Sequence, residues 1–278
     1  MGRREKILWG LLILEFAIFI KSLSAGLVMN PFVLDSLPKV LLVSLPVILL
    51  ILHAVWTLPA SRGIMFILIA ATTGLIFEII GLRGGTVFGG PYEYHLGGWT
   101  MFEVPLLVVL FWAVFIYTGY CITTSCLYWL GKNKPNKKQN NLYLLAPLIL
   151  FDGLIVVTID LFLDPLFVKL GAWKWLEGGV YFGVPVGNFF GWFMVTIIST
   201  GIFRLFEYIK DQEVKQIDRS LFLIPVSGYG LLAISFTILA LQNQIRRLST
   251  ISLLLTLPIV ITNIALFIRQ KTKTKSLQ

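Results

Sequence analysis

Six carboxylate residues lie inside or at the ends of long apolar segments of this sequence: Glu15, Glu78, Glu103, Asp152, Asp160 and Asp164. An ionisable group inside a bilayer costs at least about 2.5–3.5 kcal/mol on insertion scales, so each of these residues is a candidate functional group. Asp160 and Asp164 are one helical turn apart on one helix face. Asp152 lies two turns away on roughly that face, and Glu78 and Glu103 are expected at a depth similar to the pair.

Carboxyl groups that share a low-dielectric pocket cannot all ionise, so at least one of them is expected to keep its proton. The pocket would then hold a general acid beside a general base. Asp160, Asp164 and Glu78 are therefore the candidate catalytic residues. A structural role, such as pairing of Asp160 or Glu78 with Arg83 or capping of a helix, is the alternative for each residue alone.

Structural roles are also expected for three other charged residues. Glu15 and Lys21 are interpreted in this way, and Glu207 is expected to pair with Arg204 or Lys210.

Two stretches rich in glycine and aromatic residues accompany the carboxylates, and they resemble each other. Residues 97–112 read GGWTMFEVPLLVVLFW and residues 177–192 read EGGVYFGVPVGNFFGW. Identities recur at a spacing of 80 positions, among them Gly98 and Gly178, Val104 and Val184, Pro105 and Pro185, and Trp112 and Trp192. Proline is favoured in the first helical turn. The repeat thus predicts two helical hairpins of the same orientation, each with a glycine- and aromatic-rich outer connection.

The composition predicts an all-α, polytopic membrane protein. The 278 residues are 57% hydrophobic and 13% charged, with a mean hydropathy of +0.85. A soluble domain of this size needs more polar surface, and the apolar runs lack the alternation of a membrane β-barrel. Because about 20 helical residues cross a bilayer, eight spans are expected, at roughly 6–26, 39–58, 63–82, 101–130, 142–164, 185–209, 220–241 and 249–268.

These spans form a single transmembrane domain, residues 1–278, with a motif-bearing core at about 70–195. Residues 131–141 are expected to be a cytosolic linker and residues 270–278 a frayed tail. The first span is interpreted as retained, because Glu15 and Lys21 interrupt it and no convincing cleavage site follows it.

The distribution of basic residues predicts the orientation. With the N-terminus inside, about 16 of the 23 Lys and Arg residues fall on the cytoplasmic side, so the positive-inside rule places both termini of a multi-pass protein in the cytoplasm. Arg246 and Arg247 oppose this assignment for the last hairpin. The net charge of +9 is thereby accounted for, and no nucleic-acid partner is expected.

Other chemistries have little support. His53 and His95 lack a metal-ligand spacing, neither a Walker loop nor a dinucleotide fingerprint is present, and no metal or cofactor is expected. Cys121 and Cys126 are expected to be buried and free. The DxxxD spacing of DLFLD is typical of magnesium-dependent intramembrane prenyltransferases, but the second acidic motif of such enzymes is missing. A lipid or solute transporter with a carboxylate proton relay is the non-enzyme alternative.

Two long motifs point to one family. FEIIGLRGGTVFGGPYEYHLGGWTMFEVPLLVVLFW and DLFLDPLFVKLGAWKWLEGGVYFGVPVGNFFGWF resemble the carotenoid biosynthesis membrane proteins, which include bacterial carotenoid 1,2-hydratases and the archaeal bisanhydrobacterioruberin hydratase. The resemblance spans roughly residues 70–195. It implies addition of water to a terminal double bond of an acyclic carotenoid or related polyisoprenoid.

The resemblance and the carboxylates imply the same chemistry. A carboxyl group would donate a proton, aromatic faces would stabilise the tertiary cation, and a carboxylate would deprotonate the incoming water. Expected partners are the lipid bilayer, the polyisoprenoid substrate and other membrane enzymes of the pathway. The residues expected to bind the substrate are Tyr92, Tyr94, Glu103, Trp112, Asp152, Trp173, Trp175, Tyr181, Asn188 and Trp192.

Overall fold

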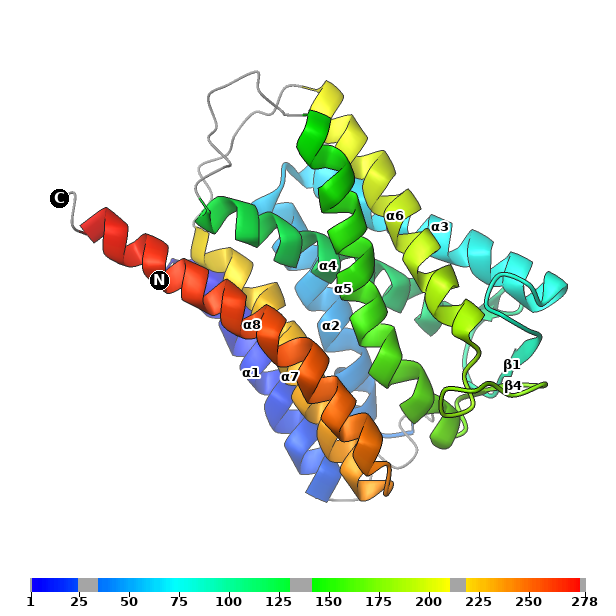
Figure 1. The fold of residues 1–278 in the computed structure, drawn as a ribbon. Helices are drawn as coiled ribbons and strands as arrows, with labels where there is room; N and C mark the ends of the chain where they lie inside the picture. Colours follow the sequence, from blue (N-terminus) through cyan, green and yellow to red (C-terminus); the bar gives the residue numbers. More distant parts are fainter. Residues whose placement is uncertain (1, 25–34, 131–141, 211–218, 276–278) are drawn as a thin grey trace.

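The computed structural model describes residues 2–24, 35–130, 142–210 and 219–275, and these form an all-α bundle (Figure 1). All eight helices are long and apolar enough to cross a membrane, which confirms the predicted fold class. They are α1 (Arg3–Ser24), α2 (Leu37–Thr57), α3 (Ala60–Gly84), α4 (Leu106–Trp129), α5 (Leu142–Lys169), α6 (Val186–Ile209), α7 (Leu223–Gln242) and α8 (Arg246–Lys275).

The helix ends differ from the expected spans in three places. Helix α4 begins at Leu106 rather than near 101, because residues 100–105 form a small hairpin. Helix α5 continues through Pro165 to Lys169, and α8 extends to Lys275 into the expected tail. The expected linker at 131–141 lies outside the described residues.

The two predicted hairpins, α3–α4 and α5–α6, are related by an approximate twofold arrangement. Helix α3 packs against α6, and α4 packs against α5 (Figure 1). The connections also pair with each other: β1 (Tyr92–Tyr94) lies antiparallel to β4 (Trp173–Trp175), with Glu93 opposite Lys174. Equivalent parts of the two repeats therefore meet across the axis between them.

Both connections end in the same two-residue turn, and this confirms the repeat in the sequence. Strand β2 (Thr100–Met101) turns into β3 (Val104–Pro105) through Phe102 and Glu103, whose φ angles are 53° and 73°. At the corresponding place in the second repeat Phe182 and Gly183 have φ angles of 51° and 88°. Positive φ at both central residues is the signature of a type I′ turn. In each repeat the turn leads through Val-Pro into the next helix.

Glycines allow the two repeats to touch backbone to backbone. A Cβ on Gly187 at the start of α6 would lie 2.6 Å from the Cα of Gly89 in the first connection. Gly179 has a different reason for being glycine: a Cβ there would collide with the backbone of Val184 across its own turn. Its φ is not among the positive values, so close approach, and not a left-handed backbone conformation, is the reason for glycine at this position.

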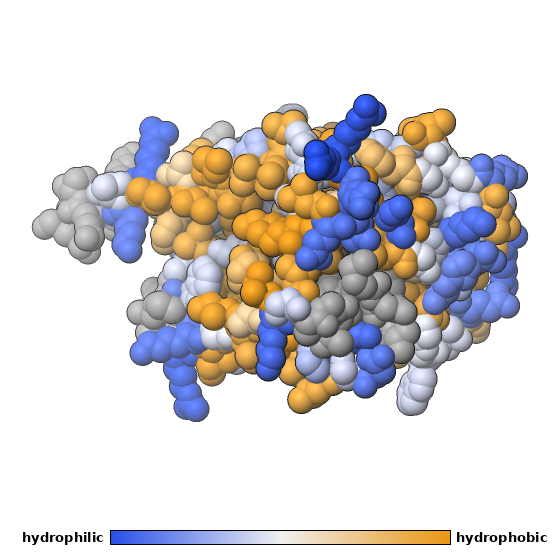
Figure 2. All heavy atoms as spheres, turned by 90° about the horizontal axis from the view of Figure 1, so that it is seen from below, coloured by the Kyte–Doolittle hydropathy of each residue, from blue (hydrophilic) through white to orange (hydrophobic). Residues whose placement is uncertain are grey.

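The outer surface of the bundle matches a lipid environment. Figure 2 shows hydrophobic side chains over much of the face seen from below, with hydrophilic side chains in separate groups. Large exposed apolar residues occur on most helices, among them Ile13, Leu68, Phe151 and Leu254. The chain is a multi-pass membrane protein.

Candidate active site

Glu78, near the C-terminal end of α3, accepts three hydrogen bonds from aromatic side chains. Its Oε2 receives the hydroxyls of Tyr92 at 2.6 Å and Tyr94 at 2.8 Å, and its Oε1 receives Nε1–H of Trp112 at 2.9 Å. The carboxyl is buried, with 4% of the residue exposed. Three donors around one carboxyl group favour its ionised form.

The two tyrosines are fixed as donors. They lie in the connection between α3 and α4, where burial and then the nearby Glu78 carboxylate raise the pKa of Tyr92 and of Tyr94 well above the usual range. Both phenols therefore keep their protons at physiological pH.

Gly74, one turn before Glu78, leaves room for the Trp112 ring, because a Cβ there would collide with it.

The second acidic group consists of Asp160 and Asp164 on α5 and Asn188 in the first turn of α6. The amide Nδ2 of Asn188 donates to Asp160 Oδ2 at 2.9 Å and to Asp164 Oδ2 at 2.6 Å. All three residues are at most 3% exposed. Asp160 Oδ1 has no hydrogen-bond partner among the described residues. Because both Oδ2 atoms accept from the same nitrogen, the two carboxyl groups lie close together, and two buried carboxyl groups this close favour a state in which one of them keeps its proton.

One cavity of about 300 Å³ brings the two acidic groups together. Glu78, Asp164 and Asn188 line it, whereas Asp160 does not. Six of the predicted aromatic residues line the same end of the cavity: Tyr92, Tyr94, Trp112, Trp173, Trp175 and Trp192. Most of the predicted site is therefore a single compartment, assembled from both repeats.

The rest of the cavity is lined mainly by apolar side chains and extends away from the acidic end. Its wall comes from α1, α2, α4 and α7. On α7 the lining reaches from Ile224 to Leu239, which at 1.5 Å per residue corresponds to about 22 Å. A cavity of this shape, with carboxyl groups at one end, suits a long apolar molecule with its reactive end at the acids.

Three predicted site residues lie elsewhere. Glu103 is exposed at the tip of its turn, and Tyr181, outside the cavity, donates its hydroxyl to the carbonyl of Leu161 at 3.0 Å. Burial and then Asp160 raise the pKa of Tyr181 to about 12. Asp152 is outside the cavity as well and belongs to a different polar cluster.

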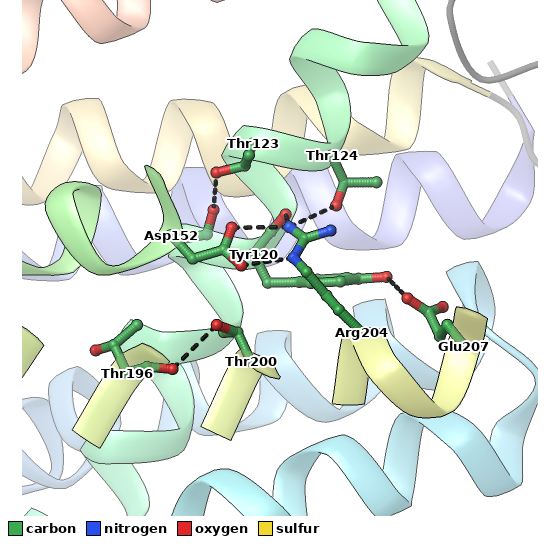
Figure 3. Close-up of polar contacts among 9 residues, drawn as sticks. Tyr120, Thr123, Thr124, Asp152, Thr196, Thr200, Arg204 and Glu207 are labelled. Carbon is green, nitrogen blue, oxygen red and sulfur yellow. Dashed lines mark hydrogen bonds and ion pairs between the residues drawn. The ribbon is translucent and has the colours of Figure 1, made fainter. Parts of the chain in front are cut away.

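That cluster lies between α4, α5 and α6 (Figure 3). Arg204 donates from Nε to Asp152 Oδ2 at 2.6 Å and from Nη2 to Oδ1 at 2.7 Å. The guanidinium lies 4.5 Å from the ring centroid of Tyr120, whose hydroxyl donates to Glu207 at 2.9 Å. The carboxylate that pairs with Arg204 is thus Asp152. Glu207 accepts a hydrogen bond from Tyr120 instead of forming the expected ion pair with Arg204 or Lys210. Both members of the ion pair are at most 6% exposed.

Sequence patterns did not identify the cavity walls contributed by α1, α2 and α7. Their apolar side chains have the same residue types as side chains that face lipid. One signal was His53, a buried polar residue in the second span. Its Nε2 donates to the carbonyl of Leu221 at 2.9 Å, so Nδ1 accepts from the hydroxyl of Tyr117 at 2.8 Å.

Among the residues that the structure describes, no three His, Cys, Asp or Glu side chains are grouped as metal ligands.

Comparison with known proteins gives one match. A family model described as "Carotenoid biosynthesis protein" matches residues 38–262, most of the chain. Neither the curated proteins nor the solved structures include a match. The matched range covers both repeats and every residue of the two acidic groups.

Proposed function

Because the chain belongs to the carotenoid biosynthesis protein family, we propose that it is a hydratase that adds water to the terminal double bond of an acyclic carotenoid or related polyisoprenoid. The observation that supports this most directly is the cavity, in which Glu78 and Asp164 line one end of a mainly apolar compartment whose α7 wall runs for about 22 Å. A hydrocarbon chain fits such walls, and a reaction at its end needs only proton transfer and water.

In the proposed reaction a proton moves from the Asp160–Asp164 pair to the less substituted carbon of the terminal double bond. The other carbon becomes a tertiary cation. Water then attacks this carbon, and its surplus proton returns to the pair, so the acid is regenerated and the net change is one added water. Asn188, bonded to both carboxyl groups, is proposed to orient them. The pair thus acts first as general acid and then as general base.

The other site residues are proposed to stabilise the cation. The faces of Trp112 and Trp192, whose ring centroids are 4.3 Å apart, border the compartment, and a desolvated cation over an aromatic face gains about 2 kcal/mol. Glu78, with its three donors, supplies a fixed negative charge to the same end of the cavity.

We also propose that the protein resides in the cytoplasmic membrane with both termini in the cytoplasm and the connections that carry β1 and β4 on the outer side. Cysteine labelling in intact cells tests this. Outer labels should react at Lys174→Cys and not at Lys210→Cys, and the reverse pattern would refute the orientation. Substrate would enter from the bilayer and pass among other membrane enzymes of the pathway.

Mass spectrometry of pigments tests the reaction. Cells that make an acyclic carotenoid and express this chain should accumulate product heavier by one water. The matched control is Asp164→Asn, measured at equal protein amount in the membrane. Unchanged pigment in cells with the folded wild-type protein would refute the proposed hydration of carotenoids.

A further inference from the structure

Glu15 on α1 is a cavity-lining carboxyl group whose role the proposed reaction leaves unassigned. It lies 12 residues into a 22-residue helix, about 18 Å from the start of the helix at 1.5 Å per residue and thus well inside a bilayer. The α1 residues around it in the cavity wall are apolar: Leu12, Phe16 and Phe19. A carboxyl group in such surroundings is costly unless something bonds to it.

The other charged or imidazole side chains that line the cavity each have a partner in the protein. Lys39 pairs with Asp35 at 3.0 Å, and His53 bonds to Tyr117. Asp164 and Glu78 hold the hydrogen bonds described above. For Glu15, by contrast, no hydrogen bond or ion pair is present with any residue in the described part of the chain.

A second polar side chain of the cavity wall is in the same situation. Ser235 of α7 lines the cavity and also makes no hydrogen bond within the described residues. Helices α1 and α7 run in the same direction side by side, and Leu12 approaches Gly228. Counting from that contact places Ser235 about one turn beyond the level of Glu15. Within the described residues the cavity therefore has two polar groups without a hydrogen-bond partner at neighbouring depths, separate from the acidic end.

We propose that Glu15 and Ser235 form a hydroxyl-binding site within the substrate cavity, and hence that the preferred substrate is an acyclic isoprenoid that carries a hydroxyl group part-way along its bound length. The inference rests on the proposed function for the identity of the chain. A carboxyl group accepts a hydrogen bond from an alcohol, and a serine hydroxyl both donates and accepts. A pure hydrocarbon would leave both groups unpaired, which penalises its binding.

Prenyl alcohols of increasing length and their methyl ethers test the site. Each pair has the same chain and the same terminal double bond, but only the alcohol can donate a hydrogen bond. Dissociation constants are measured from ligand-induced thermal stabilisation of the purified full-length protein in detergent. At one chain length the alcohol should bind about ten-fold more tightly than its ether, since hydrogen bonds to charged groups contribute on this scale. That length reports the distance from the acids to Glu15.

Variants identify the residue responsible. Glu15→Leu should abolish the preference for the alcohol, Glu15→Gln should retain part of it, and the neighbouring Phe16→Leu should change alcohol and ether binding equally. Equal affinities at every chain length in the wild type, or a preference that survives in Glu15→Leu, would overturn the proposal. The readout is binding, so a lack of water addition in the pigment assay, with the alcohol preference intact, would instead refute the hydratase reaction.

Discussion

Trp112 and Trp192 occupy equivalent places in the two repeats, 80 positions apart, and their rings meet with centroids 4.3 Å apart and planes inclined by 41°. Trp112 also donates to Glu78, whereas Trp192 belongs to the helix that carries Asn188. The contact therefore joins the carboxylate of the first repeat to the acidic pair of the second. Neither hairpin alone contains both acidic groups.

The two tryptophans should respond differently to substitution. Trp112→Phe keeps an aromatic face but removes the N–H donor to Glu78, so turnover should fall about ten-fold or more, the scale of a charge-assisted hydrogen bond. Trp192 makes no side-chain hydrogen bond within the described residues, and Trp192→Phe should stay within about three-fold of wild type. Trp192→Leu, which removes the aromatic face, should lose about 30-fold. Equal losses for the two Phe variants, measured as product per membrane protein, would count against these roles.

The acidic pair can be tested with isosteric amides. Asp164→Asn and Asp160→Asn each keep the shape of the side chain and remove one carboxyl group of the proposed acid, so the hydration rate should fall by about 10²-fold or more. Asn188→Leu should reduce the rate without loss of folded protein. If both aspartate variants turned over at near the wild-type rate, the acid would have to be sought at Glu78.

Metal removal distinguishes hydration from prenyl transfer. The proposed reaction uses only carboxyl groups, water and aromatic faces, so EDTA should leave hydration by purified protein unchanged. A strict requirement for magnesium, restored by adding the ion back, would favour the prenyltransferase interpretation of the DxxxD spacing of Asp160 and Asp164.

The ion pair of Asp152 and Arg204 should contribute to folding rather than to turnover. Either Asp152→Leu or Arg204→Leu leaves one charge buried without its partner, which should destabilise the protein by about 3–5 kcal/mol. The double variant should recover much of this loss, because no unpaired charge remains. The free energy of unfolding in detergent is measured for the two single variants and the double variant. Glu207→Gln is the control and should have a smaller effect. Additive losses in the double variant would contradict the pairing.

Backbone contact at Gly179 gives a second test of folding. Gly179→Ala places a methyl group against the Val184 backbone and should sharply reduce the amount of folded protein in the membrane. Gly97→Ala is the matched control in the first connection, because a Cβ there meets nothing within 4 Å. Similar membrane levels for the two variants would mean that the turn can shift to admit the side chain.

Much of the architecture could be predicted because it depends on local patterns. The Val-Pro pairs at Pro105 and Pro185 mark the starts of α4 and α6, and the one-turn spacing of Asp160 and Asp164 gives their common face. Periodicity predicts the depth of a residue in the membrane and the helix face on which it lies, but it does not predict which helix packs against that face. The donor of Trp112 to Glu78 and the pairing of Asp152 with Arg204 join residues 34 and 52 positions apart, and these contacts appear only in three dimensions.

The position of Glu103 in a turn could not be predicted from its residue type. A carboxylate before Val-Pro in an aromatic motif suggests a functional group, yet the residue occupies the turn position that Gly183 fills in the other repeat, with φ of 73° and 88° respectively. A turn position depends on backbone conformation, which residue type alone does not specify for glutamate.

The unlike carboxyl groups of the two repeats have a kinetic consequence. Although the hairpins are related by an approximate twofold arrangement, they build one acidic end, to which the first contributes Glu78 and the second the aspartate pair. A symmetrical polyene with two reactive ends can present only one of them at a time. Under the proposed hydration it must leave the cavity, reverse in the bilayer and enter again, so we expect modification of such a molecule to be distributive, with release of the singly hydrated form as a free intermediate.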